Sequence, residues 1–282
     1  MNYLFSLLSI FKRFKRKISL TFILLSMENI LNLLIPFFLG IAINDLINGK
    51  YDGVLYFSVI FFGMLIVGVI RRVYDTRVYA GIYSNLATET VESQIQKRSS
   101  DSQVVARSNL VEKISDFFEY ELPTGFTSLF AVVGSIIMLF IFDYKIFVAG
   151  IGAIILIVLV YVFSEKKIFG YNKSMNDQLD KHVDIISSKK KESIFSHFKK
   201  IAFWKIKLSD LESLNYGIIE VILFGLIIFT LVIAATQTNA TPGSIFAILA
   251  YVIDFAEGVG MLPFIYQQKV RLDEIVTRIN AA

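Results

Sequence analysis

Long stretches without a charged side chain divide this sequence. Residues 54–70, 122–142 and 146–164 contain no Asp, Glu, Lys or Arg. Residues 213–236 contain one acid and residues 243–268 contain two. A helix needs about 20 mostly apolar residues to cross the hydrocarbon core of a bilayer. The pattern therefore predicts five membrane-spanning helices.

A sixth span precedes these five. Within residues 18–47 the stretch from Ile30 to Ile43 is apolar except for Asn32, and Glu28 and Asn29 precede it. The sequence thus predicts an all-α polytopic membrane protein with six transmembrane helices. We expect the spans at residues 18–47, 54–72, 121–142, 146–165, 213–236 and 243–266.

Two connections between the predicted spans are much longer than the others. Residues 73–120 and 166–212 contain few Gly and Pro, and their apolar residues recur every three to five positions. That spacing is typical of helices. We expect four of the spans to continue about 15–20 residues, or 25–30 Å, beyond the bilayer as two helical hairpins. The alternative for residues 166–212 is a small separate helical domain.

Polar breaks mark the expected tips of the two hairpins. We expect another molecule to dock at these tips, because helical hairpins that extend so far beyond the bilayer need a partner to contact. The alternative for the lysine run in the second tip is a solvated face or a contact with lipid headgroups. The first tip comprises Ser99, Ser100, Asp101 and Ser102, and the second Ser187, Ser188, Lys189, Lys190 and Lys191.

The first 17 residues combine an apolar stretch with five positive charges. The positive charges follow the apolar residues, whereas in a signal peptide they precede them. The segment 1–17 is predicted to be an amphipathic helix in the membrane interface, and the alternative is a disordered tail. The residues expected to face lipid are Leu4, Leu7, Leu8, Phe11 and Phe14.

Composition supports the membrane assignment and excludes several chemistries. Hydrophobic residues make up 55% of the chain and charged residues only 18%, against about 45–50% and 25% in soluble domains. The absence of Cys excludes disulfides, thiol nucleophiles and Cys-ligated metals. His182 and His197 have no metal-ligand spacing and are expected to be solvated.

The distribution of Lys and Arg indicates the orientation. The N-terminus carries 5, residues 71–121 carry 7, residues 165–212 carry 11 and the end after residue 268 carries 3 of the 28 basic residues. Positive loops stay in the cytoplasm. Both termini and both long connections are therefore expected there, in a multi-pass protein of the cytoplasmic (inner) membrane. Arg71, Arg72 and Arg77 are expected to mark the inner boundary of the second span.

Two segments carry a family resemblance. Residues 34–45, LIPFFLGIAIND, look like the proline- and glycine-containing first helix of ATP-binding-cassette (ABC) exporter transmembrane domains. Residues 255–279 resemble the end of the sixth helix in a bacterial subgroup of stand-alone six-span ABC domains. The resemblance implies the exporter transmembrane fold over residues 18–282. It also implies a two-fold dimer (a homodimer, or a heterodimer with a related half), hairpin tips that dock on nucleotide-binding domains, and alternating access.

A nucleotide-binding domain is expected to be missing. A phosphate-binding loop needs G-x-x-x-x-G-K-[ST], and the one Gly-Lys pair, Gly49-Lys50, is followed by Tyr51. Asp273-Glu274 imitates an acidic magnesium-binding pair, but Lys269 and Arg271 interrupt the apolar strand that should precede it. We therefore expect no cofactor in this chain and no ATPase activity of its own. A separate nucleotide-binding ATPase subunit would supply the energy, unless the chain is a truncation.

Acids inside the spans are the candidate transport residues, since a charge costs about 2.5–3.5 kcal/mol at a helix centre on insertion scales. Glu28 and Glu220 are expected nearer the inner leaflet. Asp254 and Glu257 lie about 17 and 21 Å along the sixth span, near the midplane. Their spacing of three places them on one helix face, with Met261 a further turn along.

Three interpretations of this acidic face stay open. In a dimer it would present four carboxylates to one cavity and favour a cationic or amphipathic basic substrate. It would otherwise carry protons. The third interpretation is structural, with Glu257 hydrogen-bonded to Tyr251, Gln267 or the backbone. Gly258 and Gly260 are expected to permit close approach of a neighbouring helix.

Three functions compete at this stage. The first is the membrane subunit of an ABC-type transporter, with membrane lipids and a separate ATPase as partners. The second is an ATP-independent channel or carrier on the same scaffold. The third is a regulatory membrane protein that docks a partner and moves nothing. An enzyme and a nucleic-acid-binding role are disfavoured, because no catalytic or metal constellation is present.

Overall fold

The computed structural model describes residues 7–98, 101–187, 189–237 and 240–280. Contacts divide the chain into two compact units, which are described separately. Unit 1 comprises residues 1–142 and 234–282, and unit 2 comprises residues 143–233. Six helices in the described residues are long and apolar enough to cross a membrane. The prediction of an all-α, six-span membrane protein is therefore confirmed.

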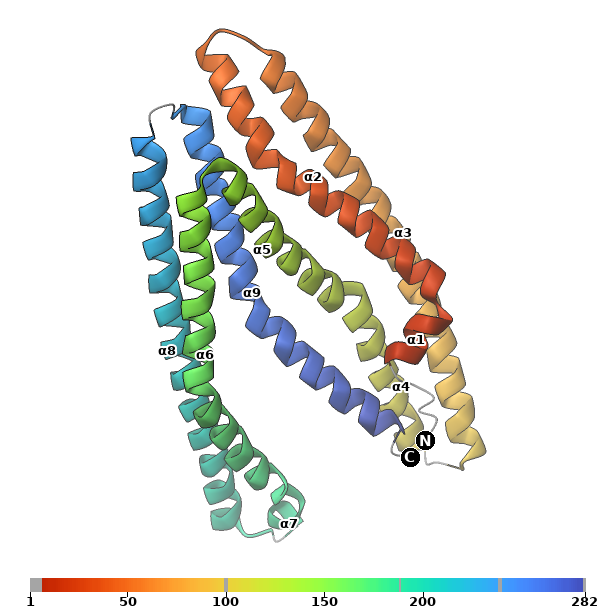
Figure 1. The fold of residues 1–282 in the computed structure, drawn as a ribbon. Coiled ribbons are helices and arrows are strands. Elements are labelled where there is room, and N and C mark those ends of the chain that lie inside the picture. The colour runs from red at the N-terminus through yellow and green to blue at the C-terminus, as the bar shows by residue number, and fades with distance from the viewer. Residues whose placement is uncertain (1–6, 99–100, 188, 238–239, 281–282) are drawn as a thin grey trace. The chain divides into compact units, whose positions relative to one another are not determined.

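Unit 1 contains four of these long helices together with shorter elements at one end (Figure 1). A turn at residues 48–51 joins the first two long helices. The elements are α1 (Leu7–Arg13), α2 (Lys15–Ile47), α3 (Asp52–Gln96), α4 (Asp101–Asp116), the π-helical turn η1 (Phe117–Glu121), α5 (Leu122–Phe142) and α9 (Pro242–Asn280).

Helices α2 and α3 run side by side along much of their length (Figure 1). Near the turn, the Gly53 backbone N–H donates to the Asp45 carboxylate at 2.9 Å. Far from it, the Arg13 guanidinium of α1 pairs with Glu89 of α3, with 2.7 Å between Nη1 and Oε2. This hydrogen bond raises the pKa of Arg13 above its ordinary value. Because both side chains are well exposed, the pair adds little stability.

Helix α9 packs closely against α2 and α5. A Cβ atom added at Gly40 of α2 would meet the backbone of Gly243 of α9, so the two backbones touch. A hydrogen bond supports this contact, because the Gly243 backbone N–H donates to the side-chain amide oxygen of Asn44 at 2.9 Å. Gly258 lies against the Ser128 carbonyl of α5, whereas a Cβ atom added at Gly260 meets no atom of the described residues within 4 Å. A helix therefore approaches closely at Gly258, whereas for Gly260 close approach stays a prediction.

A hydrophobic cluster holds the end of unit 1 where the chain extends beyond its apolar spans. It joins α1 and the start of α2 to the extension of α3, to α4 and to η1. Phe14 is half-buried and packs partly against this cluster, so its expected contact with lipid stays a prediction. Phe11 is 39% exposed. Leu4 and the side chains of Leu7 and Leu8 lie outside the described residues. The fully or nearly buried members are Ile10, Ile18, Val78, Tyr79, Ile82, Leu86, Val111, Ile114, Phe117 and Phe118.

Unit 2 is a second long hairpin (Figure 1). It consists of α6 (Tyr144–Leu179), the short α7 (His182–Ser187) and α8 (Lys191–Thr236), whose last residues belong to unit 1. Asp143 caps α6 by accepting hydrogen bonds from the next turn. The Ser164 hydroxyl donates to Asn215 at 2.7 Å and joins the apolar parts of the two long helices.

The two histidines of unit 2 meet, contrary to the expectation that both are solvated. His197 is only 2% exposed, and its Nε2 lies 3.1 Å from Nδ1 of His182. Phe198 packs edge-on against the His182 ring. The residues are fifteen apart but come from α7 and α8, so the turn between those helices creates the contact.

Both hairpins turn where the sequence is polar. The described backbone adopts the left-handed conformation at Arg98, with φ 54°, and at Lys189, with φ 53°. Such a residue commonly terminates a helix. Asp101 begins α4, Ser187 ends α7 and Lys191 begins α8. Ser99, Ser100 and Ser188 lie outside the described residues, as does the side chain of Ser102.

Candidate functional site

A cavity of about 650 Å³ lies within unit 1. Residues of α2, α3, η1, α5 and α9 line it. This volume falls within the roughly 300–1,000 Å³ of small-molecule sites. The lining is unusual for apolar helices because it holds six charged residues, which are Arg71, Arg72, Asp75, Glu119, Asp254 and Glu257.

Helix α9 contributes the acidic wall. Asp254, Glu257 and Met261 all line the cavity, as their spacing on one helix face predicted. Asp254 is partly buried and Glu257 is exposed. Gly258 lies on the same wall, and its contact with Ser128 closes the gap between α9 and α5. The role of these residues in transport stays a prediction.

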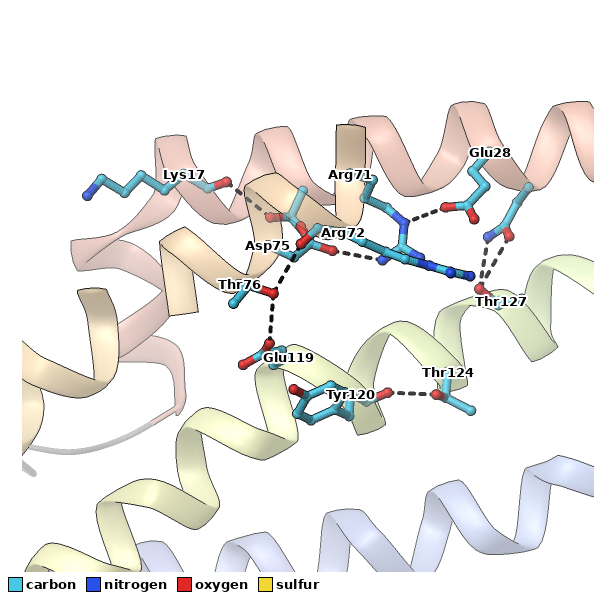
Figure 2. Close-up of polar contacts among 12 residues, drawn as sticks. Lys17, Glu28, Arg71, Arg72, Asp75, Thr76, Glu119, Tyr120, Thr124 and Thr127 are labelled. Carbon is cyan, nitrogen blue, oxygen red and sulfur yellow. Dashed lines mark hydrogen bonds and ion pairs between the residues drawn. The ribbon is translucent and has the colours of Figure 1, made fainter. Parts of the chain in front are cut away.

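Helix α3 contributes the basic wall, where Arg71 is the centre of an ion-pair network. Its Nε donates to Glu28 of α2, and its Nη1 donates to Asp75 one turn along α3 at 2.7 Å (Figure 2). The three side chains are 14%, 17% and 5% exposed. Glu28 meets basic residues as expected, although it does not itself line the cavity.

Arg72 differs from its neighbour in having no ion-pair partner among the described residues. Its side chain is exposed and lines the cavity, and Figure 2 shows it extending toward Thr127. It was expected only to mark a membrane boundary. In the structure both Arg71 and Arg72 lie in the same cavity as the acids of α9.

The π-helical turn η1 brings in further polar groups. Pro123 has no backbone N–H, so the Glu119 carbonyl receives no helical hydrogen bond from it. The Leu122 N–H donates to the carbonyl of Phe117, five residues back and not four as in an α-helix. Such π-bulges occur frequently at functional sites. Glu119 and Tyr120 of this turn line the cavity, and Thr76 of α3 donates to the Glu119 carboxylate at 3.4 Å (Figure 2).

Amides and hydroxyls complete the lining. Asn29 of α2 and Thr127 of α5 hydrogen-bond across the cavity wall at 3.2 Å. Pro36 lies inside α2 and cannot donate to the carbonyl of Asn32, another lining residue. Ser135 Oγ is fully buried and has no hydrogen-bond partner among the described residues.

The remaining candidates lie elsewhere. Glu220 is exposed on α8 in unit 2. Tyr251, an alternative partner of Glu257, donates its hydroxyl to the Leu33 carbonyl at 2.8 Å. The side chain of Gln267 lies outside the described residues. None of the hairpin-tip residues that the structure describes lines the cavity.

Six membrane-length helices and a charged cavity among four of them define a multi-pass membrane protein with an internal polar site. The model of the ABC transporter transmembrane region matches residues 7–243. The chain therefore belongs to this family of transporter membrane domains. Members generally dimerise and pair with nucleotide-binding subunits. No curated protein matches the chain.

Proposed function

We propose that this chain is the membrane subunit of an ABC-type transporter, and that the cavity of unit 1 is part of its substrate path. The observation that supports this most is the set of six charged residues lining a cavity among membrane-length helices. Two of them, Asp254 and Glu257, lie well inside a membrane span, where charges are costly and generally serve substrate, ion or proton pathways. Family membership supports the same function.

The proposed path opens toward the cytoplasm. From the first residue of α9, Asp254 is about 18 Å along the helix, and from the first residue of α3, Arg72 is about 30 Å along. Because the hydrocarbon core is about 30 Å thick, Asp254 lies near its middle and Arg72 lies at the boundary opposite the helix starts. The basic residues concentrate beyond that boundary, which supports a cytoplasmic location for the cavity mouth and both termini in the cytoplasmic membrane.

The proposed substrate is cationic or amphipathic and basic. The lining contains four acids and two arginines, and the carboxylate of Glu28 further neutralises Arg71. A net negative lining favours positively charged ligands. The acids of α9 make no ion pair among the described residues, so their carboxylates are available to a ligand.

ATP hydrolysis is proposed to come from a separate nucleotide-binding subunit, because these 282 residues contain no phosphate-binding loop. We propose that it docks at the two hairpin tips, residues 99–102 and 187–191. We further propose a dimer with a second copy or a related half.

Purification from native membranes in mild detergent tests this partner. Mass spectrometry of the co-purifying proteins is expected to identify a nucleotide-binding ATPase. The same preparation from a variant with Lys189, Lys190 and Lys191 changed to Gln is expected to retain less of it. Transport by the purified chain alone, without ATP, would replace the proposal by an ATP-independent carrier. The absence of both an ATPase and transport would favour a regulatory protein.

Transport by the reconstituted complex is expected to depend on the acidic wall. The double variant Asp254→Asn, Glu257→Gln keeps the size of both side chains and removes their charges. Uptake of a labelled basic tripeptide, Lys-Phe-Gly, into proteoliposomes is expected to fall at least tenfold, since charge-assisted hydrogen bonds contribute about 1.5–3 kcal/mol each. Glu92→Gln, exposed on α3 and outside the cavity lining, is the matched control and should transport normally. Unchanged uptake in the double variant would contradict a role for these acids.

A further inference from the structure

The cavity contains a positive group that a purely cationic ligand leaves unused. Arg71 is neutralised by Glu28 and Asp75. Arg72 pairs with neither Glu28 nor Asp75, although its exposed side chain lines the same cavity. The four lining acids come from α3, η1 and α9, yet none lies within 4.0 Å of its guanidinium. Arg72 therefore presents free N–H donors to whatever occupies the cavity.

Two buried polar atoms in the lining also lack partners. Asp75 is 3% exposed and Ser135 is fully buried. Asp75 Oδ1 and Ser135 Oγ make no hydrogen bond within the described part of the chain. A buried polar atom without a partner costs about 1–3 kcal/mol. Both residues line the cavity, but these two atoms have no accessible surface, so a ligand reaches them only if the lining rearranges.

The charges of opposite sign lie on different helices. Arg72 belongs to α3, whereas Asp254 and Glu257 belong to α9. Both of these helices pack against α2, and apolar residues such as Leu33 of α2 and Phe130 of α5 line the space as well. A simple cation would satisfy the acids and leave Arg72 unpaired. A simple anion would face four carboxylates.

We propose that the cavity binds an amphoteric molecule, such as a short basic peptide with a free carboxylate. Its cationic groups contact Asp254 and Glu257, its carboxylate accepts hydrogen bonds from Arg72, and an apolar middle part lies against Leu33 and Phe130. This inference rests on the proposed function, because it takes the cavity to be the substrate path. It adds that the substrate carries an anionic group, which the count of lining acids alone would argue against.

Binding of three matched peptides to the purified full chain in detergent tests the inference. The probes are Lys-Phe-Gly with free termini, its C-terminal amide, and N-acetyl-Gln-Phe-Gly. The wild type is expected to bind the free peptide at least tenfold more tightly than the amide. The variant Arg72→Gln should abolish that difference by weakening binding of the free peptide alone. The wild type should also bind Lys-Phe-Gly more tightly than N-acetyl-Gln-Phe-Gly, which lacks the positive charges. The double variant Asp254→Asn, Glu257→Gln should abolish this second preference.

Arg77→Gln is the matched control, because Arg77 is exposed on the same helix and bonds to the Val73 carbonyl outside the cavity. It should preserve both preferences. Equal affinity of the wild type for free peptide and amide would overturn the inference, as would no binding of any peptide. A zwitterionic lipid headgroup has related chemistry, so the measurement is repeated in nanodiscs of phosphatidylethanolamine. Loss of peptide binding there would assign the cavity to lipid and also overturn the inference.

The binding measurement needs neither ATP nor a partner. Tight peptide binding without any transport by the reconstituted complex would contradict the proposed function and leave the amphoteric site intact. Transport of free peptide and amide at the same rate, with equal affinity, would contradict the amphoteric site and leave the proposed function intact.

Discussion

Replacing Arg71 with Gln is expected to lower the free energy of unfolding by about 3–5 kcal/mol, as when one partner of a buried ion pair is removed. The substitution leaves two carboxylates, those of Glu28 and Asp75, with no counter-charge. Their side chains are only 17% and 5% exposed, so water compensates little. Loss of folded protein in fluorescence-detected size exclusion and a lower thermal midpoint in detergent would measure the effect.

Two variants show whether the unpaired charges cause this loss. Arg77→Gln removes an exposed arginine from the same helix and should change stability by less than about 0.5 kcal/mol. A triple variant, Glu28→Gln, Arg71→Gln, Asp75→Asn, removes the charges together and should recover much of the stability. If the triple variant is no more stable than Arg71→Gln alone, the packing of the arginine and not the pairing of charge explains the network.

A single methyl group at Gly243 is expected to separate α9 from α2. The Gly243→Ala variant places its Cβ against the backbone of Gly40, which cannot rotate away as a side chain would. Overpacking of this kind typically costs about 1–3 kcal/mol. The hydrogen bond from the Gly243 N–H to Asn44 would lengthen as well. A lower thermal midpoint of the purified chain is the expected result.

Gly260→Ala is the matched control, because it adds the same atom to the same helix. Among the residues that the structure describes, none has an atom within 4 Å of the added Cβ at that position. Alanine is favoured over glycine in helices by about 1 kcal/mol, so this variant should be neutral or slightly more stable. Equal destabilisation by both substitutions would mean that glycine flexibility, and not contact between backbones, determines the requirement at Gly243.

The six spans were predictable because a bilayer imposes one simple condition, a length of apolar sequence, that can be counted locally. The acidic face of α9 was predictable for a similar reason. Asp254, Glu257 and Met261 are three and four residues apart, so helix geometry alone places them together, and all three line the cavity.

The basic wall was not predictable in this way. Arg72 and Asp254 are far apart in the sequence, and only the packing of α2, α3, α5 and α9 brings them to one cavity. Arg71 looked like a boundary marker because its partner Glu28 lies on another helix. The contact between His182 and His197 likewise depends on how α7 folds back on α8. The π-turn that places Glu119 had one local signal, the proline at position 123.

The family assignment agrees with the fold but does not specify the cargo. The ABC transporter transmembrane region covers residues 7–243, whereas Glu257 and Met261 lie beyond residue 243. The properties of the substrate must therefore be argued from the cavity itself. Within that cavity, the unpaired Arg72 and the acids of α9 are the groups that we expect to determine selectivity.

Cysteine accessibility tests most directly whether this cavity is a water-filled path open to the cytoplasm. The chain contains no Cys, so a single introduced thiol reports one position. Glu257 lines the cavity, whereas Ile253 is 45% exposed on α9 and does not line it. The variants compared are Glu257→Cys and Ile253→Cys. A membrane-impermeant thiol reagent should label Glu257→Cys in inside-out vesicles much more than Ile253→Cys, which lies off the cavity lining. Labelling of Glu257→Cys only from the outside, or from neither side, would contradict the account.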